Sequence, residues 1–297
     1  MSEERLLFIY NPNAGRGLVK EHLPAILELL SASGYELIVH ATLGQKDAAE
    51  VAGKYARESL CSRIICAGGD GTLDEVAGAV LQAGSGIPIG YIPAGSTNDL
   101  GYSLGLPGDM LKATETALNG SVFPCDIARF NESFFTYTAA FGAFTEVTYD
   151  TPQNIKNVLG HTAYILNCLT KLDTLHTYHA RVTYDGKTYE EDYLLGMVAS
   201  ATSVGGIKGV TGEGVELDDG LHELILIKAP GRISKLYGVI NDVIMRNLNG
   251  KYIRYARVDS VKFEFTDPTP WSLDGEYGGM VSEADISVIK QGIRYIR

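Results

Sequence analysis

Cysteine is scarce in this sequence, and its spacing fits no common metal site. The chain has 297 residues and four cysteines, which stand far apart without a CxxC pair: Cys61, Cys66, Cys125 and Cys168. This spacing argues against a zinc site and against a disulfide framework. Reduced thiols, as in the cytosol, are the simplest interpretation.

Long apolar runs are also missing. The run nearest the N-terminus, Leu6–Tyr10, covers five residues before Asn11 and Pro12. It is too short for the apolar region of a signal peptide, and no other run reaches the ~20 residues of a membrane-spanning helix. We therefore expect a soluble, cytoplasmic protein that touches a membrane only peripherally, at its inner face.

Basic residues are outnumbered by acidic ones. The chain has 25 Lys and Arg against 36 Asp and Glu, a net charge of −11, which argues against nucleic-acid binding. Residues 228–257 are the exception, with seven basic residues and one acidic residue, Asp242. Apolar residues at helical spacing in this segment predict an amphipathic helix. Its apolar stripe favours packing on the protein, whereas its positive charge favours orientation at an anionic membrane.

In residues 1–125, strand-length apolar runs alternate with segments of helical spacing. The expected strands are Leu6–Tyr10, Glu36–His40, Arg63–Cys66 and Pro88–Ile92, and the expected helices are Val19–Leu30, Ala48–Glu58 and Leu73–Gln82. This alternation predicts an α/β domain with a doubly wound parallel sheet. Such sheets bind ligands at the carboxyl ends of their strands.

Strand-like segments dominate residues 126–297, which predicts a second, β-rich sandwich domain. The expected strands are Phe134–Ala140, Ala180–Tyr184, Tyr193–Ala199, Leu224–Lys228, Val261–Phe265 and Ala284–Ile289. Two helices are expected among them, Ile155–Leu172 and Arg232–Leu248.

Three loops at successive strand ends carry the residues of an anion site. The loop Gly68-Gly69-Asp70-Gly71-Thr72 offers backbone N–H groups at a helix start, which suits phosphate oxygens. Its carboxylate would repel a bare phosphate, so it fits a bound Mg²⁺ or a hydroxyl partner. The other two loops are Asn11–Gly17 and Pro93–Asp99. Any one of them could be an ordinary turn, but three together favour a shared site.

Two acidic turns lie in the second half of the chain. Asp274-Gly275-Glu276 is by itself most simply a solvated turn, but phosphoryl transfer to an alcohol uses a carboxylate to take the hydroxyl proton. The turn Asp218-Asp219-Gly220 is equally compatible with a hairpin and with a divalent-cation site.

The motifs NPNAG, GGDGT, PAGSTND, DDG and DGE, in this order, resemble the bacterial diacylglycerol kinase catalytic family, which includes relatives of sphingosine and ceramide kinases. The resemblance covers essentially the whole chain. It implies that a nucleotide-binding domain and a β-sandwich form the active site in the cleft between them. ATP and Mg²⁺, a lipid alcohol at a membrane surface and a homodimer are the implied cofactors and partners.

The resemblance also implies roles for individual residues. The nucleotide-binding positions are Asn11, Pro12, Asn13, Ala14, Gly15, Thr42, Gly68, Gly69, Asp70, Gly71, Thr72, Leu73, Asp74 and Thr97, with Ser96 and Asn98 from the third loop. The residues that position Mg²⁺, directly or through water, are Asp70, Asp99 and Asp126. A structural Mg²⁺ site is implied at Glu216, Asp219 and Leu221, with Glu216 and Leu221 acting through their backbone carbonyls. The implied catalytic residues are Asp70 and the pair Asp274 and Glu276, one of which is the base.

Other functions stay open at this point. An NAD kinase also carries a GGDGT loop, and a non-catalytic nucleotide-binding module would need no base. A hydrolase is disfavoured, because the G-x-S-x-G match at Gly101–Gly105 follows an expected helix start instead of a strand. The sequence does not select among diacylglycerol, a sphingoid base, undecaprenol or another amphiphilic alcohol.

Overall fold

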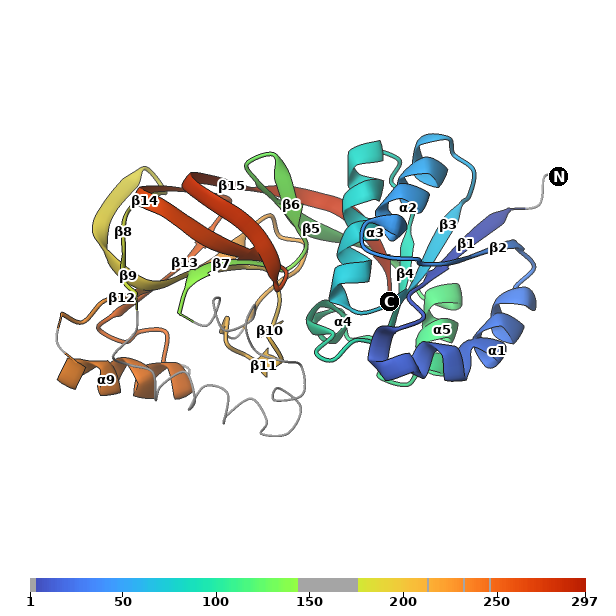
Figure 1. Ribbon diagram of the computed structural model, residues 1–297, viewed down its shortest axis with the longest axis horizontal. Helices are drawn as coiled ribbons and strands as arrows, with labels where there is room; N and C mark the ends of the chain where they lie inside the picture. Colours follow the sequence, from blue (N-terminus) through green and yellow to red (C-terminus); the bar gives the residue numbers. More distant parts are fainter. Residues whose placement is uncertain (1–3, 144–175, 213, 232, 246) are drawn as a thin grey trace. The chain divides into compact units, whose positions relative to one another are not determined.

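The computed structural model describes residues 4–297 except 144–175, 213, 232 and 246. These residues form two compact units (Figure 1). Unit 1 comprises Met1–Ile127 and Lys290–Arg297, and unit 2 comprises Ala128–Ile289. The sequence division placed the last eight residues in the second domain, whereas in the structure the chain returns to unit 1.

Unit 1 is built on a parallel sheet in the order β2-β1-β3-β4-β15. Its strands are β1 (Arg5–Tyr10), β2 (Glu36–Ala41), β3 (Arg63–Gly68), β4 (Ile89–Pro93) and the end of β15 (Glu276–Ile296). β1 and β3 are buried almost throughout, as expected of central strands covered on both faces. Because all strands are parallel, the loops that follow β1, β3 and β4 lie at one edge of the sheet.

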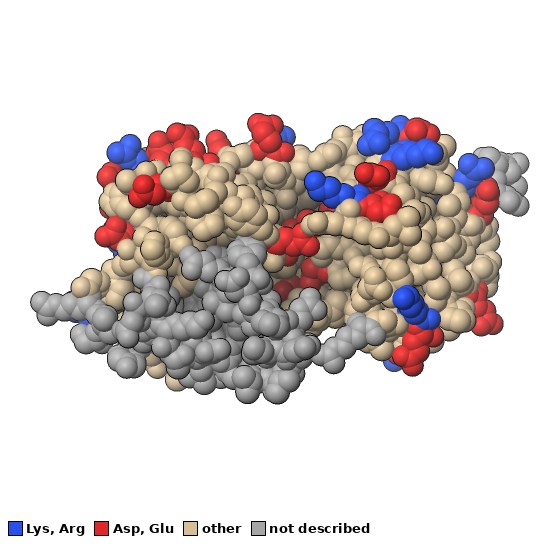
Figure 2. Space-filling view, viewed as in Figure 1, with Lys and Arg blue, Asp and Glu red and all other residues tan. Residues whose placement is uncertain are grey.

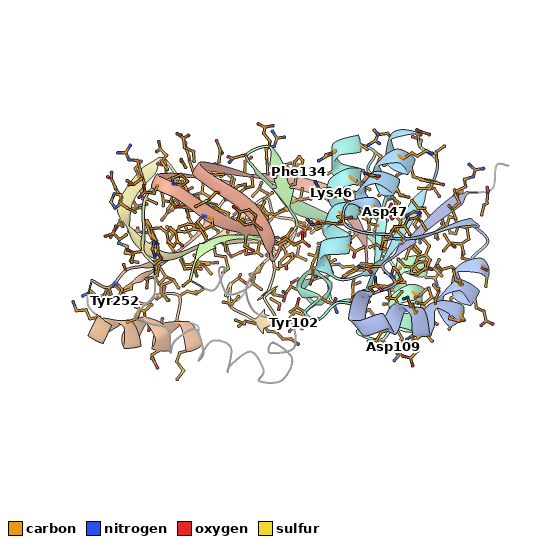
Figure 3. The ribbon with its side chains drawn as sticks, viewed as in Figure 1. Lys46, Asp47, Tyr102, Asp109, Phe134 and Tyr252 are labelled. Carbon is orange, nitrogen blue, oxygen red and sulfur yellow. The ribbon has the colours of Figure 1, made fainter. Side chains whose placement is uncertain are left out.

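Helices cover both faces of this sheet, which confirms the doubly wound prediction (Figure 1). α1 (Leu18–Ser31) and α5 (Met110–Asn119) pack on one face through Ile26, Leu30 and Ala113. α2 (Asp47–Arg57) and α3 (Asp70–Ala83) pack together on the other. The short helices η1 (Ala14–Gly17) and α4 (Asp99–Ser103) lie in the loops. Asp109, labelled in Figure 3, caps α5 by accepting from the N–H groups of Leu111 and Lys112.

Unit 2 is a β-sandwich whose two layers share long, bent strands. Its strands are β6 (Ser133–Phe135), β7 (Thr138–Gly142), β8 (Tyr178–Tyr184), β9 (Lys187–Ala199), β12 (His222–Lys228), β13 (Ile253–Val258), β14 (Ser260–Leu273) and most of β15, with β5 (Val122–Phe130) entering from unit 1 and a small ribbon of β10 (Ser203–Val204) and β11 (Ile207–Lys208). β9 pairs with both β7 and β8, and so does β14, so these four strands close a ring.

An aromatic core fills this ring. Trp271 is fully buried, and its ring lies 5.0 Å from Phe141 and 5.2 Å from Phe263. A Cβ at Gly196 would overlap the ring of Phe141, so this position on β9 needs glycine. The tight fit fixes how β7, β9 and β14 approach one another.

Helix α9 (Ile233–Ile244) covers the outer face of the unit 2 sheet, where Leu236 and Val239 pack against Ile225 and Ile227. It corresponds to the expected helix Arg232–Leu248, but it is shorter. The other expected helix, Ile155–Leu172, lies outside the described residues.

Candidate functional site

The three glycine-containing loops of unit 1 pack directly against one another. A Cβ on Gly95 would lie 2.8 Å from the Cα of Gly69, and a Cβ on Gly15 would lie 2.5 Å from the carbonyl oxygen of Ala94. Gly15 also has a φ of 57°, which L side chains rarely adopt. Absence of side chains therefore lets the three backbones meet at the carboxyl ends of β1, β3 and β4.

The loop after β3 presents the start of α3. Gly69 is the N-cap residue and provides no side-chain cap, so the first helical N–H groups have no side-chain acceptor there. The hydroxyl of Thr72 accepts from the Asn11 amide at 3.4 Å, which ties the first loop to the second. Leu73 is buried beneath them, and Asp74 is half-buried. Backbone N–H groups at a helix start are suited to phosphate.

The loop after β4 folds back on that helix start. The Thr97 hydroxyl donates to the Asp70 carboxylate at 3.0 Å. Asn98, in the left-handed conformation, accepts from the N–H of Gly95 at 2.7 Å and returns a bond to the Gly95 carbonyl. Ser96 is exposed. The expected residues of this loop therefore lie beside Asp70, and a polar oxygen of Asp70 is already oriented by Thr97.

Tyr91 is a component of this site that sequence reasoning missed. Its hydroxyl donates to the Gly68 carbonyl (3.2 Å) and lies 3.3 Å from the Asn98 side-chain oxygen. Burial raises the pKa of Tyr91 well above its usual value, and the nearby carboxylates of Asp70 and Asp99 raise it further. The carboxylates of Asp70 and Asp99 thus both lie close enough to the buried Tyr91 hydroxyl to act on its pKa. Nothing in the strand sequence IGYIP distinguishes this tyrosine from a core residue.

The acidic residues of unit 1 fit a magnesium ion that is held partly by other ligands. Asp99 is fully buried, and Asp126 is 2% exposed and accepts from the N–H of Gln291 at 2.7 Å. Within the described residues no three His, Cys, Asp or Glu side chains lie close enough to bind a metal by themselves. Mg²⁺ commonly uses one or two carboxylates together with waters and nucleotide phosphates. Asp70 and Asp99 are the residues that would provide the carboxylates.

Thr42 directly follows β2, next to the first loop. Its N–H donates to the Tyr10 carbonyl at 2.9 Å, which continues the pairing of β2 with β1. The following turn is fixed by Lys46, whose N–H donates to the Glu75 carboxylate at 2.7 Å. Lys46 and Asp47 lie at the start of α2, as labelled in Figure 3.

In unit 2, Asp274 and Gly275 form the two-residue turn between β14 and β15. Both have positive φ, 50° and 85°, as in the hairpin turns that match the twist of the strands. Asp274 is 5% exposed, and its carboxylate accepts four hydrogen bonds. They come from the N–H and hydroxyl of Thr136 and from the N–H groups of Tyr137 and Thr138 (2.5–3.0 Å).

These bonds explain why the expected strand Phe134–Ala140 is interrupted. The backbone at Thr136 and Tyr137 donates to Asp274 between β6 and β7. Glu276, by contrast, is exposed. Exposed apolar side chains follow it on β15, Tyr277 (59% exposed) and Met280 (61%), and sequence reasoning had not selected either.

The carboxylate of the expected structural metal site, Asp219, is engaged within the protein. Asp219 forms an ion pair with Arg257 through one carboxylate oxygen and accepts from the Leu221 N–H at 2.8 Å through the other. Arg257 also lies 3.7 Å from the buried carboxylate of Glu223. Glu216 is exposed. A cation site formed by this carboxylate with the backbone carbonyls of Glu216 and Leu221 stays a prediction.

Several cations of residues 228–257 are engaged within the protein. Lys228 pairs with Glu191, Arg257 pairs with Asp219, and Arg254 stacks on Tyr189. Along the upper edge of unit 2 in Figure 2, basic residues stand beside acidic ones. No helix in the described part of the chain has the length and hydropathy needed to cross a membrane.

Ser103, the central serine of the G-x-S-x-G match, lies inside helix α4 and donates to the Asp99 carbonyl at 2.8 Å. It does not stand on a turn between a strand and a helix, which a hydrolase nucleophile of that motif requires.

Comparisons with known proteins match both halves of the chain. Residues 5–130 match the diacylglycerol kinase catalytic domain, and residues 141–294 match the YegS C-terminal NAD kinase beta sandwich-like domain. Two curated relatives are named diacylglycerol kinase. That of Bacillus subtilis (strain 168) is 35% identical over 94% of this chain and 91% of its own length, and that of Staphylococcus carnosus is 32% identical over 98% and 94%.

Solved structures from Bacillus anthracis are also similar. One superposes with a TM-score of 0.84 at 27% identity and covers 100% of this chain and 96% of its own. A second, of a protein named a diacylglycerol kinase, has a TM-score of 0.78 at 25% identity and covers 100% and 97%.

Proposed function

The chain belongs to the diacylglycerol kinase family, and on that premise we propose that it transfers the γ-phosphate of ATP to a hydroxyl of diacylglycerol or a similar lipid alcohol. The observation that carries the proposal is the close packing of the three glycine-containing loops at the carboxyl ends of β1, β3 and β4, with the Asp70 carboxylate held beside them by Thr97. Sites of this kind suit a polyphosphate.

The loops of unit 1 bind and orient the nucleotide. We place the phosphates at the start of α3, where Thr97 holds the Asp70 carboxylate in place. Asp70 and Asp99 are the residues that would hold Mg²⁺, with waters and phosphate oxygens completing its shell. Bound Mg²⁺ would neutralise charge that develops on the transferring phosphoryl group.

The hairpin of unit 2 provides the base, and the geometry favours Glu276 over Asp274 for this role. Both carboxylate oxygens of Asp274 already accept two hydrogen bonds each, so this side chain holds the turn in shape. Glu276 is exposed, two residues further along. Its carboxylate takes the proton of the acceptor hydroxyl while that oxygen bonds to the γ-phosphorus and ADP leaves.

The acceptor is proposed to be a lipid because the curated relatives are named diacylglycerol kinase and because Tyr277 and Met280 expose apolar surface next to Glu276. A lipid acceptor requires peripheral association with a membrane. A homodimer also stays a prediction, which sedimentation of the purified protein would test.

The test is transfer of labelled γ-phosphate from ATP, with Mg²⁺ or EDTA, to a panel of lipid alcohols in mixed micelles. NAD serves as the alternative acceptor, because the second half of the chain matches a domain described as NAD kinase beta sandwich-like. We expect Mg²⁺-dependent label on a lipid. Label on NAD alone, or on no acceptor despite measurable ATP binding, would refute the proposal.

A further inference from the structure

At one end of unit 2, polar side chains collect inside the sandwich where apolar packing would be expected. Tyr252, labelled in Figure 3, directly precedes β13 at this end. We name the group the Arg254 cluster, and its members are Tyr184 on β8, Tyr189 and Tyr193 on β9, and Arg254 on β13. Strand pairing brings them together: β8 pairs with β9, β9 with β12, and β12 with β13.

Arg254 is held firmly but lacks a negative partner. Its guanidinium carbon lies 3.7 Å from the centre of the Tyr189 ring, and its positive charge acts against the rise that burial causes in the pKa of Tyr184. Its Nε is buried without an acceptor. None of the ion pairs among the described residues includes Arg254. A half-buried guanidinium with an unmade hydrogen bond is unfavourable unless an acceptor, best an anion, completes it.

Tyr193 adds a second donor of the same kind. The side chain is fully buried, and its hydroxyl has no hydrogen-bond partner among the described residues. Burial, and after it the carboxylate of Glu191, raise the pKa of Tyr193 to about 12. The hydroxyl therefore keeps its proton at neutral pH and can donate it.

The acidic residues close to the cluster are already neutralised. Glu191 forms an ion pair with Lys228, which stands opposite Tyr193 at a bulge between β9 and β12. The neighbouring acids on β9 pair elsewhere, Glu190 with Arg181 and Asp192 with His179. The positive charge of Arg254 is thus left without compensation inside the protein.

We propose that the Arg254 cluster binds a small tetrahedral oxyanion of the phosphate class, with the guanidinium of Arg254 and the hydroxyl of Tyr193 as its donors. Arg presents several N–H groups in one plane and binds phosphate oxygens through more than one of them. A bound water would satisfy one donor, but it would leave the charge of Arg254 uncompensated. The anion is either free phosphate or the phosphate of a lipid headgroup.

This site is independent of the proposed catalytic residues, because its members belong to other strands of unit 2. Its role is to join the β8–β9 hairpin to β13 at the edge of the sheet. Occupation therefore stabilises unit 2 and, if the anion is a headgroup, holds this end of the unit at an anionic membrane.

The experiment compares wild type with Tyr193→Phe and Arg254→Met. Tyr193→Phe removes one oxygen and keeps the ring, so folding is preserved and can be checked by circular dichroism. Arg181→Met is the matched control, because Arg181 is an exposed arginine of β8 that does not belong to the cluster. Affinity for inorganic phosphate is measured from thermal stability at constant ionic strength, with chloride in place of phosphate as reference. Vesicles of phosphatidylglycerol or phosphatidylcholine form the second arm, read by co-sedimentation.

We expect phosphate to stabilise wild type and Arg181→Met, Tyr193→Phe to bind about tenfold more weakly at the cluster, and Arg254→Met to lose the part of the stabilisation that the cluster provides. The same order for phosphatidylglycerol vesicles, without a response to free phosphate, identifies a lipid headgroup as the source. Phosphate can also bind the nucleotide loops of unit 1, but these variants leave that contribution unchanged. If wild type and both cluster variants respond equally to phosphate and to vesicles, the cluster binds no anion and the proposal is wrong.

Discussion

The carboxylate of Asp274 is predicted to stabilise the fold, whereas that of Glu276 is predicted to carry the chemistry. The two residues stand on either side of Gly275, so their roles can be separated by matched substitutions. Asp274→Asn keeps the size of the side chain and one acceptor oxygen. Its NH₂ group, however, replaces the oxygen that accepts from the N–H and hydroxyl of Thr136. The N–H groups of the new amide then point at these two donors, and both hydrogen bonds are lost.

The cost follows from these bonds. Each hydrogen bond to a charged, buried acceptor contributes about 1.5–3 kcal/mol, so the loss of two amounts to roughly 3–6 kcal/mol of unfolding free energy. For a unit of this size the melting temperature should fall by on the order of 10 °C. Glu276→Gln changes an exposed side chain and should shift it by no more than about 2 °C.

Calorimetric melting of both variants tests the stability part of this division. Phosphoryl transfer, measured at a temperature well below both melting transitions, tests the catalytic part. We expect Glu276→Gln to melt like wild type and to lose about 10²-fold or more in kcat, with ATP binding retained. Asp274→Asn should show the opposite order, with a large loss of stability and a smaller loss of kcat. If Asp274→Asn melts with wild type while Glu276→Gln keeps full activity, the reasoning about both carboxylates is refuted.

Three further changes probe the loops and the buried charges. Gly95→Ala places a Cβ 2.8 Å from Gly69 Cα, so the two loops must separate. ATP affinity measured by calorimetry should fall about tenfold or more, and the melting temperature should fall as well; unaltered affinity would show that the loops can separate freely. Gly275→Ala forces a residue with a side chain to a φ of 85° and should cost about 1 kcal/mol, which a chemical denaturation midpoint at or above that of wild type would contradict. Burial raises the pKa of Glu223 to about 7 and lowers that of His222 to about 4. Between about pH 4.5 and 6.5, the Glu223 shift therefore makes the free energy of unfolding fall as pH rises, whereas the His222 shift makes it rise. Each effect amounts to on the order of 3 kcal/mol. Wild-type stability should therefore be nearly flat in this range, Glu223→Gln should make it rise with pH, and equal pH profiles for the two proteins would show that Glu223 does not titrate there.

The first unit was largely readable from the sequence. Its apolar runs and helical spacing identify the strands β1 to β4 and three of the helices, and the glycine loops fall at their ends. Local patterns are sufficient here because each strand is buried on both faces and each loop follows its strand directly. The packing of Gly69 against Gly95 could be anticipated only as a shared site, since the contact itself depends on the order of the strands.

The second unit was predicted less completely because its key contacts are distant in sequence. The strand expected at Phe134–Ala140 is divided by Asp274, more than 130 residues away, and no local pattern reports such a bond. The pairing of Asp219 with Arg257 depends on the adjacency of β12 and β13 in the same way. Which carboxylate of the DGE turn is buried likewise follows from the turn conformation and from its partners on β6 and β7.

Strand β15 also sets the order in which the protein can be completed during synthesis. Ile293, Tyr295 and Ile296 are buried in unit 1, where the end of β15 pairs with β4. The ribosome makes these residues after all of unit 2, roughly 200 residues later than β4, and translation at ~5–20 residues per second separates the two strands by at least several seconds. Throughout that interval one edge of β4 has no strand partner from β15. A nascent chain at this stage exposes an edge that chaperones or other chains can occupy, so the late synthesis of β15 delays the protection of the nucleotide-binding sheet.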